Sequence, residues 1–227
     1  MNYHSLFKDI LYFDEAHAYV HVPTGKKLPS VTGLIKKYSK PFDEKFWLPK
    51  KAKQLGVSEY ELKKEWDLKG KIGRETGTII HNYLENRFRG KIFPFNVPDY
   101  ISKERVAKLI EVCERYYNEC EYEVAALELV VGNEFYAGTL DKLLEGGIIR
   151  DYKQGSLKDG YDMMKYPYAD MIDSSLNKYA VQLNHYRHAL EEKGITINKM
   201  EIVFFEEDGY SIHNIPFLPV IIEDQVL

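Results

Sequence analysis

Residues 138–155, "GTLDKLLEGGIIRDYKQG", place charged side chains inside two β-like runs that flank a Gly-Gly pair. Charges in the middle of strands are rarely buried unless they are paired or functional. Alternation along a strand sends residues two apart to the same face, so Asp151 and Lys153 project together while Tyr152 points the other way. The stretch therefore predicts an antiparallel hairpin that carries a carboxylate beside an ammonium group.

The register of this hairpin decides whether a second carboxylate joins the first. A two-residue turn at the Gly-Gly pair would place Asp141 opposite Tyr152, facing away from Asp151. A three-residue loop over 145–147, or one bulge with a glycine at positive φ, would place Asp141 opposite Asp151. We predict the odd-length register, which brings the two aspartates onto one face.

Two aspartates and a nearby backbone carbonyl, that of Tyr152, supply the hard oxygen ligands that Mg²⁺ or Mn²⁺ prefers. The adjacent Lys153 can orient or polarise a water molecule as the nucleophile. Such a site suits hydrolysis of phosphodiester bonds. The alternative is a surface hairpin with an ordinary Asp–Lys pair, because D-x-K is a short pattern.

The remaining sequence predicts a mixed architecture. Residues 10–22 favour a β-hairpin, and a short helix should follow, capped by Ser30 or Thr32 and ended by Pro41. Residues 42–68 look helical but broken at Pro49 and Gly56, which predicts a small helical insertion rich in lysine. Further helices are expected over 77–90, 102–122 and 174–194, and strands over 125–131, 135–145, 147–153 and 200–207.

This order predicts an α/β (α+β) fold with a central mixed sheet flanked by helices. The 227 residues contain no Pro/Gly/Ser-rich divider. We therefore expect a single domain over 1–227, with a hairpin and helical extension over 1–72 and a core over 73–227.

Composition narrows the functional classes. Cys113 and Cys120 lack the spacing of a thiolate metal clamp, and no G-x-x-x-x-G-K-[ST] phosphate loop occurs, so no nucleotide cofactor is expected. The net charge of −4 argues against coating nucleic acid by bulk charge, although a local basic surface remains possible. The sequence has no apolar run of spanning length and no secretory signal pattern, which predicts no membrane partner and a cytoplasmic protein.

Asp141, Asp151 and Lys153 resemble the signature of the PD-(D/E)XK nuclease superfamily, an acid in one strand and (D/E)-x-K in the next. The proline that often precedes the first acid is replaced by Leu140. Gly138 to Asp141 instead fits the G-x-x-D form that is common in the RecB-type branch, which includes many phage exonucleases.

Two helical motifs resemble the same branch. "GTIIHNYLE" is similar to its G-T-x-x-H-x-x-x-E element, which implies that His81 offers a ring nitrogen to the metal site and that Glu85 supports it. "QLNHY" resembles its Q-x-x-x-Y element, which implies that Gln182 and Tyr186 face the cleft near the lysine and the nucleic-acid backbone. Taken alone, the His–Glu pair would be read as a surface pair and Tyr186 as a core residue.

Other residues are weaker candidates. Glu128 resembles an acid that some members carry on the preceding strand, and could be a further metal ligand. Residues that could contact substrate combine positive charge with aromatic rings; they are Arg74, Lys158, Tyr161 and Lys165, with Tyr166 and Tyr168 beside them.

The resemblance implies a restriction-endonuclease-like core and a Mg²⁺- or Mn²⁺-dependent deoxyribonuclease acting on DNA. We expect an exonuclease; the alternatives are an endonuclease of repair or restriction type and a catalytically weak nucleic-acid-binding protein. Members with an iron–sulfur cluster use four cysteines, so none is expected with two. The resemblance also implies a bacterial or phage-infected cell and a possible recombination or helicase partner, and leaves the oligomeric state open.

Overall fold

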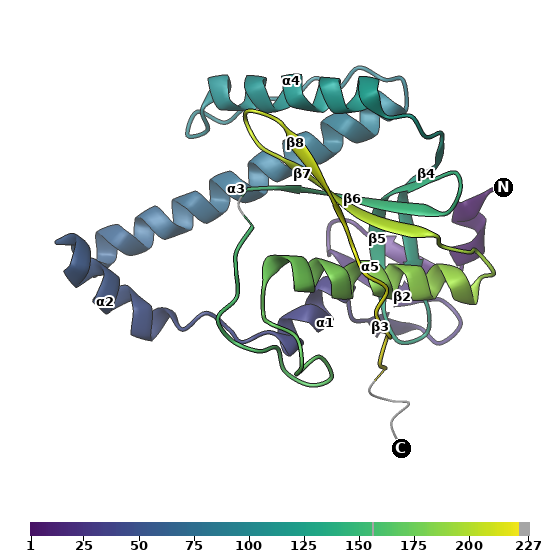
Figure 1. The fold of residues 1–227 in the computed structure, drawn as a ribbon, viewed down its shortest axis with the longest axis horizontal. Helices are drawn as coiled ribbons and strands as arrows, with labels where there is room; N and C mark the ends of the chain where they lie inside the picture. Colours follow the sequence, from purple (N-terminus) through teal and green to yellow (C-terminus); the bar gives the residue numbers. More distant parts are fainter. Residues whose placement is uncertain (156, 223–227) are drawn as a thin grey trace.

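A computed structural model describes residues 1–155 and 157–222 (Figure 1). Its centre is a five-stranded sheet in the order β4-β5-β6-β7-β8. The strands are β4 (Val124–Gly132), β5 (Ala137–Leu144), β6 (Ile148–Gln154), β7 (Lys199–Phe205) and β8 (Tyr210–Asn214). Strands β6 and β7 pair in parallel and the other neighbours pair antiparallel, so the predicted central mixed sheet is confirmed.

Helices cover both faces of this sheet (Figure 1). Helices α3 (Glu59–Phe88) and α4 (Lys103–Glu119) lie on one face, where Leu84 and Leu109 pack against Tyr152 and Phe205. Helix α5 (Ser175–Glu192) crosses the other face and connects β6 to β7. Because a parallel pair needs a long crossover, α5 is the element that places β7 beside β6.

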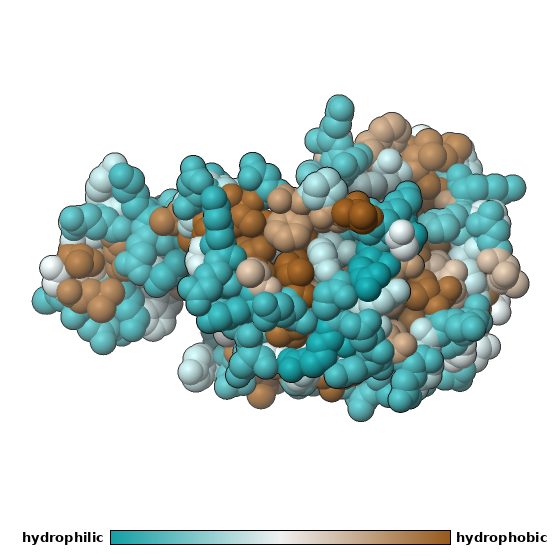
Figure 2. Space-filling model, turned by 90° about the horizontal axis from the view of Figure 1, so that it is seen from above, coloured by the Kyte–Doolittle hydropathy of each residue, from teal (hydrophilic) through white to brown (hydrophobic). Residues whose placement is uncertain are grey.

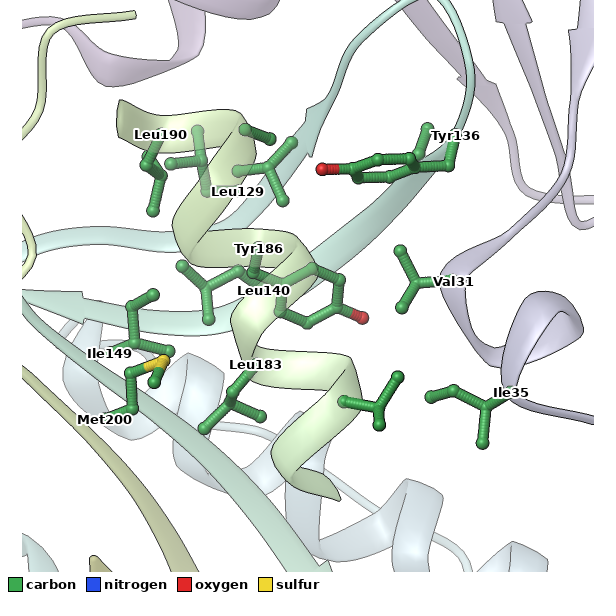
Figure 3. Packing of buried hydrophobic residues seen from close by; sticks show 14 of the residues in the cluster. Val31, Ile35, Leu129, Tyr136, Leu140, Ile149, Leu183, Tyr186, Leu190 and Met200 are labelled. Atoms are coloured by element: carbon green, nitrogen blue, oxygen red, sulfur yellow. The ribbon is translucent and has the colours of Figure 1, made fainter. Parts of the chain in front are cut away.

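The larger core lies under α5. Figure 3 shows Leu183 and Tyr186 of α5 facing Leu140 and Ile149 of the sheet. Helix α1 (Val31–Tyr38) closes this side, and its N-cap is Ser30, whose hydroxyl accepts a hydrogen bond from the Gly33 amide. Ser30 therefore satisfies an orphan amide at the start of the helix, as the sequence predicted.

The N-terminal segment forms a small sheet beside this core. After a 3₁₀ turn, η1 (Tyr3–Phe7), strands β1 (Ile10–Phe13) and β2 (Ala18–His21) form the predicted hairpin. A third strand, β3 (Lys26–Leu28), pairs with β2 and was not predicted, and neither was β8. Both missed strands are short and polar, and mainly their pairing partners make them strands.

Helix α2 (Glu44–Leu55) and the first half of α3 project from the body as an arm, residues 42–71 (Figure 1). The two helices are tied by Lys63, which pairs with Glu44 at 2.6 Å. The expected break at Pro49 is wrong, because α2 runs through it and ends at Gly56, whose φ is +69°. A proline there removes only the bond to the Lys45 carbonyl, on an exposed residue that water can reach.

The expected boundary between residues 72 and 73 falls within α3, so the N-terminal extension and the core share this helix. Among the described residues, no helix combines the length and the apolar character that crossing a membrane requires.

Candidate active site

The β5–β6 hairpin has the odd-length register. Lys142 pairs with Arg150 and Leu144 with Ile148, across a three-residue loop in which Gly146 and Gly147 have φ of +81° and +71°. Continuing this register places Asp141 opposite Asp151, as predicted.

A third carboxylate continues the row on the other side of β5. Leu127 pairs with Lys142 and Leu129 with Leu140, so Glu128 of β4 stands opposite Asp141. Its φ of +47° lies in the left-handed region, which is costly for a residue with a side chain. Glu128, Asp141 and Asp151 thus form a row of carboxylates across three adjacent strands.

The ladder between β5 and β6 is interrupted at this row. The Tyr152 amide donates to Asp141 Oδ2 at 2.6 Å, and the Tyr152 carbonyl accepts from His81 Nε2 at 3.0 Å. Side chains therefore replace the backbone partners that β5 would otherwise provide.

His81 joins two of the three carboxylates. Candidate ligand atoms of His81, Glu128 and Asp141 all lie within 4.8 Å of one another, and His81 Nδ1 is 3.4 Å from Asp141 Oδ1. Two carboxylates and an imidazole, beside the Tyr152 carbonyl, form a donor set that fits Mn²⁺ or Mg²⁺. These residues could hold a divalent metal ion, and His81 lies where the resemblance implied.

The ionisation of the cluster reflects its crowded negative charge. Burial raises the pKa of Glu128 to about 8 and that of Asp151 to about 6, and in both cases the Asp141 charge adds to the shift. Burial alone would lower the pKa of His81, but Asp141 raises it to about 9. Burial also opposes ionisation of Asp141, yet His81 lowers the pKa of that carboxyl. Nearby positive charge, from His81 and Lys153, is therefore what favours the ionised form of Asp141.

Asp151 has different partners from the other two acids. One of its oxygens is paired with Lys153, and the other lies 3.5 Å from Gln182 Nε2. Burial would lower the pKa of Lys153, but Asp151 and Asp141 outweigh it and raise that pKa above the ordinary lysine value. Asp151 lies outside the group of three candidate ligands, and its oxygens contact Lys153 and Gln182, so its role as a metal ligand stays a prediction.

Gln182 and Tyr186 support Asp151 from beneath. Gln182 donates to the Tyr186 hydroxyl at 2.9 Å, and the two residues are 7% and 2% exposed. The expectation that both face the cleft is wrong, because Tyr186 belongs to the core under α5 (Figure 3). A Cβ on Gly138, three residues before Asp141, would lie 2.5 Å from the Tyr186 ring. The glycine therefore leaves the space that the Tyr186 ring occupies.

A cleft of about 530 Å³ opens beside this row of carboxylates, the acid row; Glu128 lines the cleft, whereas Asp141 and Asp151 are buried and are not among its lining residues. Its walls come from α3, β1, β4 and β6, and include Arg74 and His81 from α3 together with Glu128 and Lys153. Glu85 pairs with Arg89 of the same helix at 2.8 Å. Glu85 was expected to support His81, but no direct contact between these two side chains is found among the described residues.

The other candidate substrate contacts lie on the segment between β6 and α5. Lys158, Tyr161 and Lys165 are exposed and are not among the residues that line the cleft. Tyr168 is a correction: it is buried against Tyr38, with ring centroids 5.4 Å apart, so it cannot stack on a base.

Two aromatic residues near the site were not predicted. Tyr12 of β1 lines the cleft, and Tyr179 of α5 lies with its ring centroid 5.2 Å from Lys153 Nζ. Tyr179 could have been found, because it shares a helix face with Gln182 and Tyr186 at i, i+3 and i+7. Tyr12 carries no such signal, since only tertiary packing brings β1 to the cleft.

Comparison with known proteins adds little about chemistry. No family model and no curated protein matches the sequence. Among solved structures, it is similar to a crystal structure of a protein from Eubacterium rectale named "Putative exonuclease", at 15% identity and a TM-score of 0.43. The match covers 62% of this chain and 59% of that chain. So distant a match leaves the function to be inferred from the side chains described above.

Proposed function

We propose that the protein is a metal-dependent nuclease that hydrolyses phosphodiester bonds of DNA, acting as an exonuclease. The observation that carries this proposal is the row of Glu128, Asp141 and Asp151, with His81 at one side and Lys153 at the other. The preference for an exonuclease comes from the resemblance of the sequence motifs to the RecB-type branch.

Each residue would have a defined part in the reaction. His81, Glu128 and Asp141 would hold the metal ion, which when bound supplies Lewis-acid polarisation of a phosphoryl oxygen and a water molecule of lowered pKa. Lys153 would orient the attacking water and stabilise charge that develops on the phosphoryl oxygens. Gln182 fixes Asp151, which in turn holds the Lys153 ammonium in place.

The direct test is cleavage of end-labelled linear DNA and closed circular DNA, single- and double-stranded, with Mg²⁺, Mn²⁺ or EDTA. Metal-dependent loss of linear substrates alone supports an exonuclease, and the labelled end gives its polarity. Cleavage of circles would replace the exonuclease with an endonuclease. Binding of DNA without cleavage under every condition would contradict the enzyme.

Metal binding should stabilise the folded protein. A ligand that binds only the folded state at about 100 times its Kd adds about 2.7 kcal/mol to the unfolding free energy. Mn²⁺ or Mg²⁺ should therefore raise the melting temperature of the wild type, and Asp141→Asn should lose this increase, since the amide keeps an acceptor for Tyr152 but loses the charge. Asp170→Asn, which neutralises an exposed acid, is the control. An undiminished increase in Asp141→Asn would rule out the proposed ligand set.

Replacing a cleft-lining glycine of α3 with alanine should raise the stability of the protein and lower its activity. Gly73 and Gly77 line the cleft, and a Cβ added to either would meet no atom within 4 Å. Gly77→Ala should therefore stabilise the helix by about 0.5–1 kcal/mol, since glycine disfavours helix interiors. The same Cβ would obstruct the floor over which substrate approaches, so hydrolysis of a dinucleotide should slow.

Gly70→Ala is the matched control for this trade, because Gly70 is not among the residues lining this cleft and its added Cβ makes an ordinary 3.4 Å contact with Arg74. It should gain helix stability while dinucleotide hydrolysis stays unchanged. Urea unfolding and initial rates measure the two effects. Full activity in a stabilised Gly77→Ala would show that substrate does not approach this helix.

A further inference from the structure

The arm carries aromatic side chains that remain exposed. Where α2 meets α3, the buried residues are Ala52 and Leu62. Phe42, Phe46 and Trp47 are instead 64%, 54% and 37% exposed. We name these three rings, with Trp66 packed edge to face against Phe42, the aromatic platform; the Phe42 and Trp66 centroids are 5.6 Å apart. Exposed aromatic surface of this extent marks a place where something binds.

One lysine lies over two of these rings. Lys50 Nζ lies 5.4 Å from the Phe46 centroid and 5.0 Å from that of Trp47. Within 1–155 and 157–222, no carboxylate forms an ion pair with the lysines of α2, whereas Glu44 is neutralised by Lys63. The α2 lysines are Lys45, Lys50, Lys51 and Lys53. Figure 2 shows the arm protruding from one end, with hydrophobic side chains exposed among hydrophilic ones.

One face of α3 leads from the platform to the acid row. Trp66, Gly70, Gly73, Gly77 and His81 follow one another at spacings of three or four residues, which places them along one helix face. Gly73, Gly77 and His81 line the cleft. Fifteen residues of helix span about 22 Å, so the base of the platform lies a few nucleotides from the metal ligands.

We infer that the aromatic platform binds single-stranded nucleic acid, the strand whose end enters the cleft. Aromatic rings bind strands by stacking on exposed base faces, and lysines beside them bind the phosphates. A duplex keeps its base faces stacked inside, so rings of this kind favour a single strand. The inference rests on the proposed function, because it treats the bound strand as substrate.

The test compares the wild type with Phe46→Ala/Trp47→Ala. Anisotropy of fluorescein-labelled dT20 in EDTA gives the Kd, and hydrolysis of a dinucleotide with Mn²⁺ reports on the acid row. The double variant should raise the Kd for dT20 by at least about tenfold. It should leave dinucleotide hydrolysis unchanged, because a dinucleotide at the metal ligands does not reach the arm. Lys50→Ala should lower the salt slope of binding by about 0.7.

Phe217→Ala is the matched control, since Phe217 is half exposed and lies under a cation, Arg187, at 5.1 Å on a segment packed against α5. It should bind dT20 as the wild type does. Phe42→Ala removes the most exposed ring of the platform and is the second test variant; unchanged melting temperatures show that each variant is folded.

The outcomes separate the two proposals. If the wild type binds dT20 but cleaves no DNA, and the double variant no longer binds dT20, the nuclease proposal is overturned and the proposed binding at the platform is kept. A wild type that cleaves DNA while the double variant binds dT20 equally well would overturn the platform alone. A wild-type dimer, seen by light scattering and broken by the double substitution with dT20 binding intact, would also overturn it, because the rings would then serve self-association.

Discussion

Lys153→Ala is expected to reduce the rate of DNA hydrolysis by about 10²–10⁴-fold, the range for loss of a positioned proton-transfer group or charge-stabilising donor. The ammonium is paired with Asp151 and faces the cleft, so its removal takes away the one cation of β6 that points to the acid row. Initial rates on end-labelled DNA at saturating Mn²⁺ measure the loss.

The control removes an ammonium of similar pairing outside the cleft. Lys178 of α5 pairs with Asp173 at 2.6 Å and does not line the cleft, so Lys178→Ala should keep its activity. The Mn²⁺-induced rise in melting temperature should survive in Lys153→Ala, because His81, Glu128 and Asp141 remain. If folded Lys153→Ala hydrolysed DNA at the wild-type rate, Lys153 would have no part in the proposed mechanism.

Glu201→Ala is expected to destabilise the fold by about 3–5 kcal/mol, the cost of leaving a buried charge without its partner. Glu201 of β7 accepts from Arg150 Nε at 2.6 Å and pairs with Lys199 at 2.5 Å, and the side chains of Arg150 and Glu201 are almost fully buried. Without Glu201, the partners that Arg150 keeps among the described residues are the Tyr116 hydroxyl, the Cys120 sulfur and the rings of Tyr116 and Tyr122, and none of these is a carboxylate.

Urea unfolding of Glu201→Ala and of a surface control measures this difference. Glu191 pairs with Arg187 at 3.0 Å on the surface of α5, so Glu191→Ala should cost less than about 1 kcal/mol. Similar losses in the two variants would mean that the Arg150–Glu201 pair does not behave as a buried one.

The contribution of Glu201 should also depend on pH. Burial would raise its pKa, but Lys199 and Arg150 outweigh this and lower it below the ordinary glutamate value. A carboxyl with a lowered folded-state pKa binds fewer protons folded than unfolded, so its contribution is complete above the ordinary value and is lost as the pH falls through the folded value. The difference between wild type and Glu201→Ala should therefore shrink in acid.

The sequence by itself determined the hairpin at the centre of the site. The two-residue period of a strand places Asp151 and Lys153 together, and the Gly-Gly pair permits the positive φ angles of a three-residue loop. These are local rules, because turn geometry fixes register over the few residues beside it. The Ser30 cap and the amphipathic helices followed from equally local patterns, whereas the parallel pairing of β6 with β7 joins residues that are far apart in the sequence.

Tertiary structure alone decided how the rest of the site is completed. Glu128 was only a weak candidate, because no sequence signal marks its left-handed φ, and its place opposite Asp141 depends on pairing with a residue thirteen positions further along the chain. Tyr186 is buried in the core, whereas the aromatic rings of the arm are exposed. The sequence does not distinguish the two cases, because burial depends on which elements pack together. Sequence periodicity reports which face of an element is apolar, but it does not report which partner covers that face.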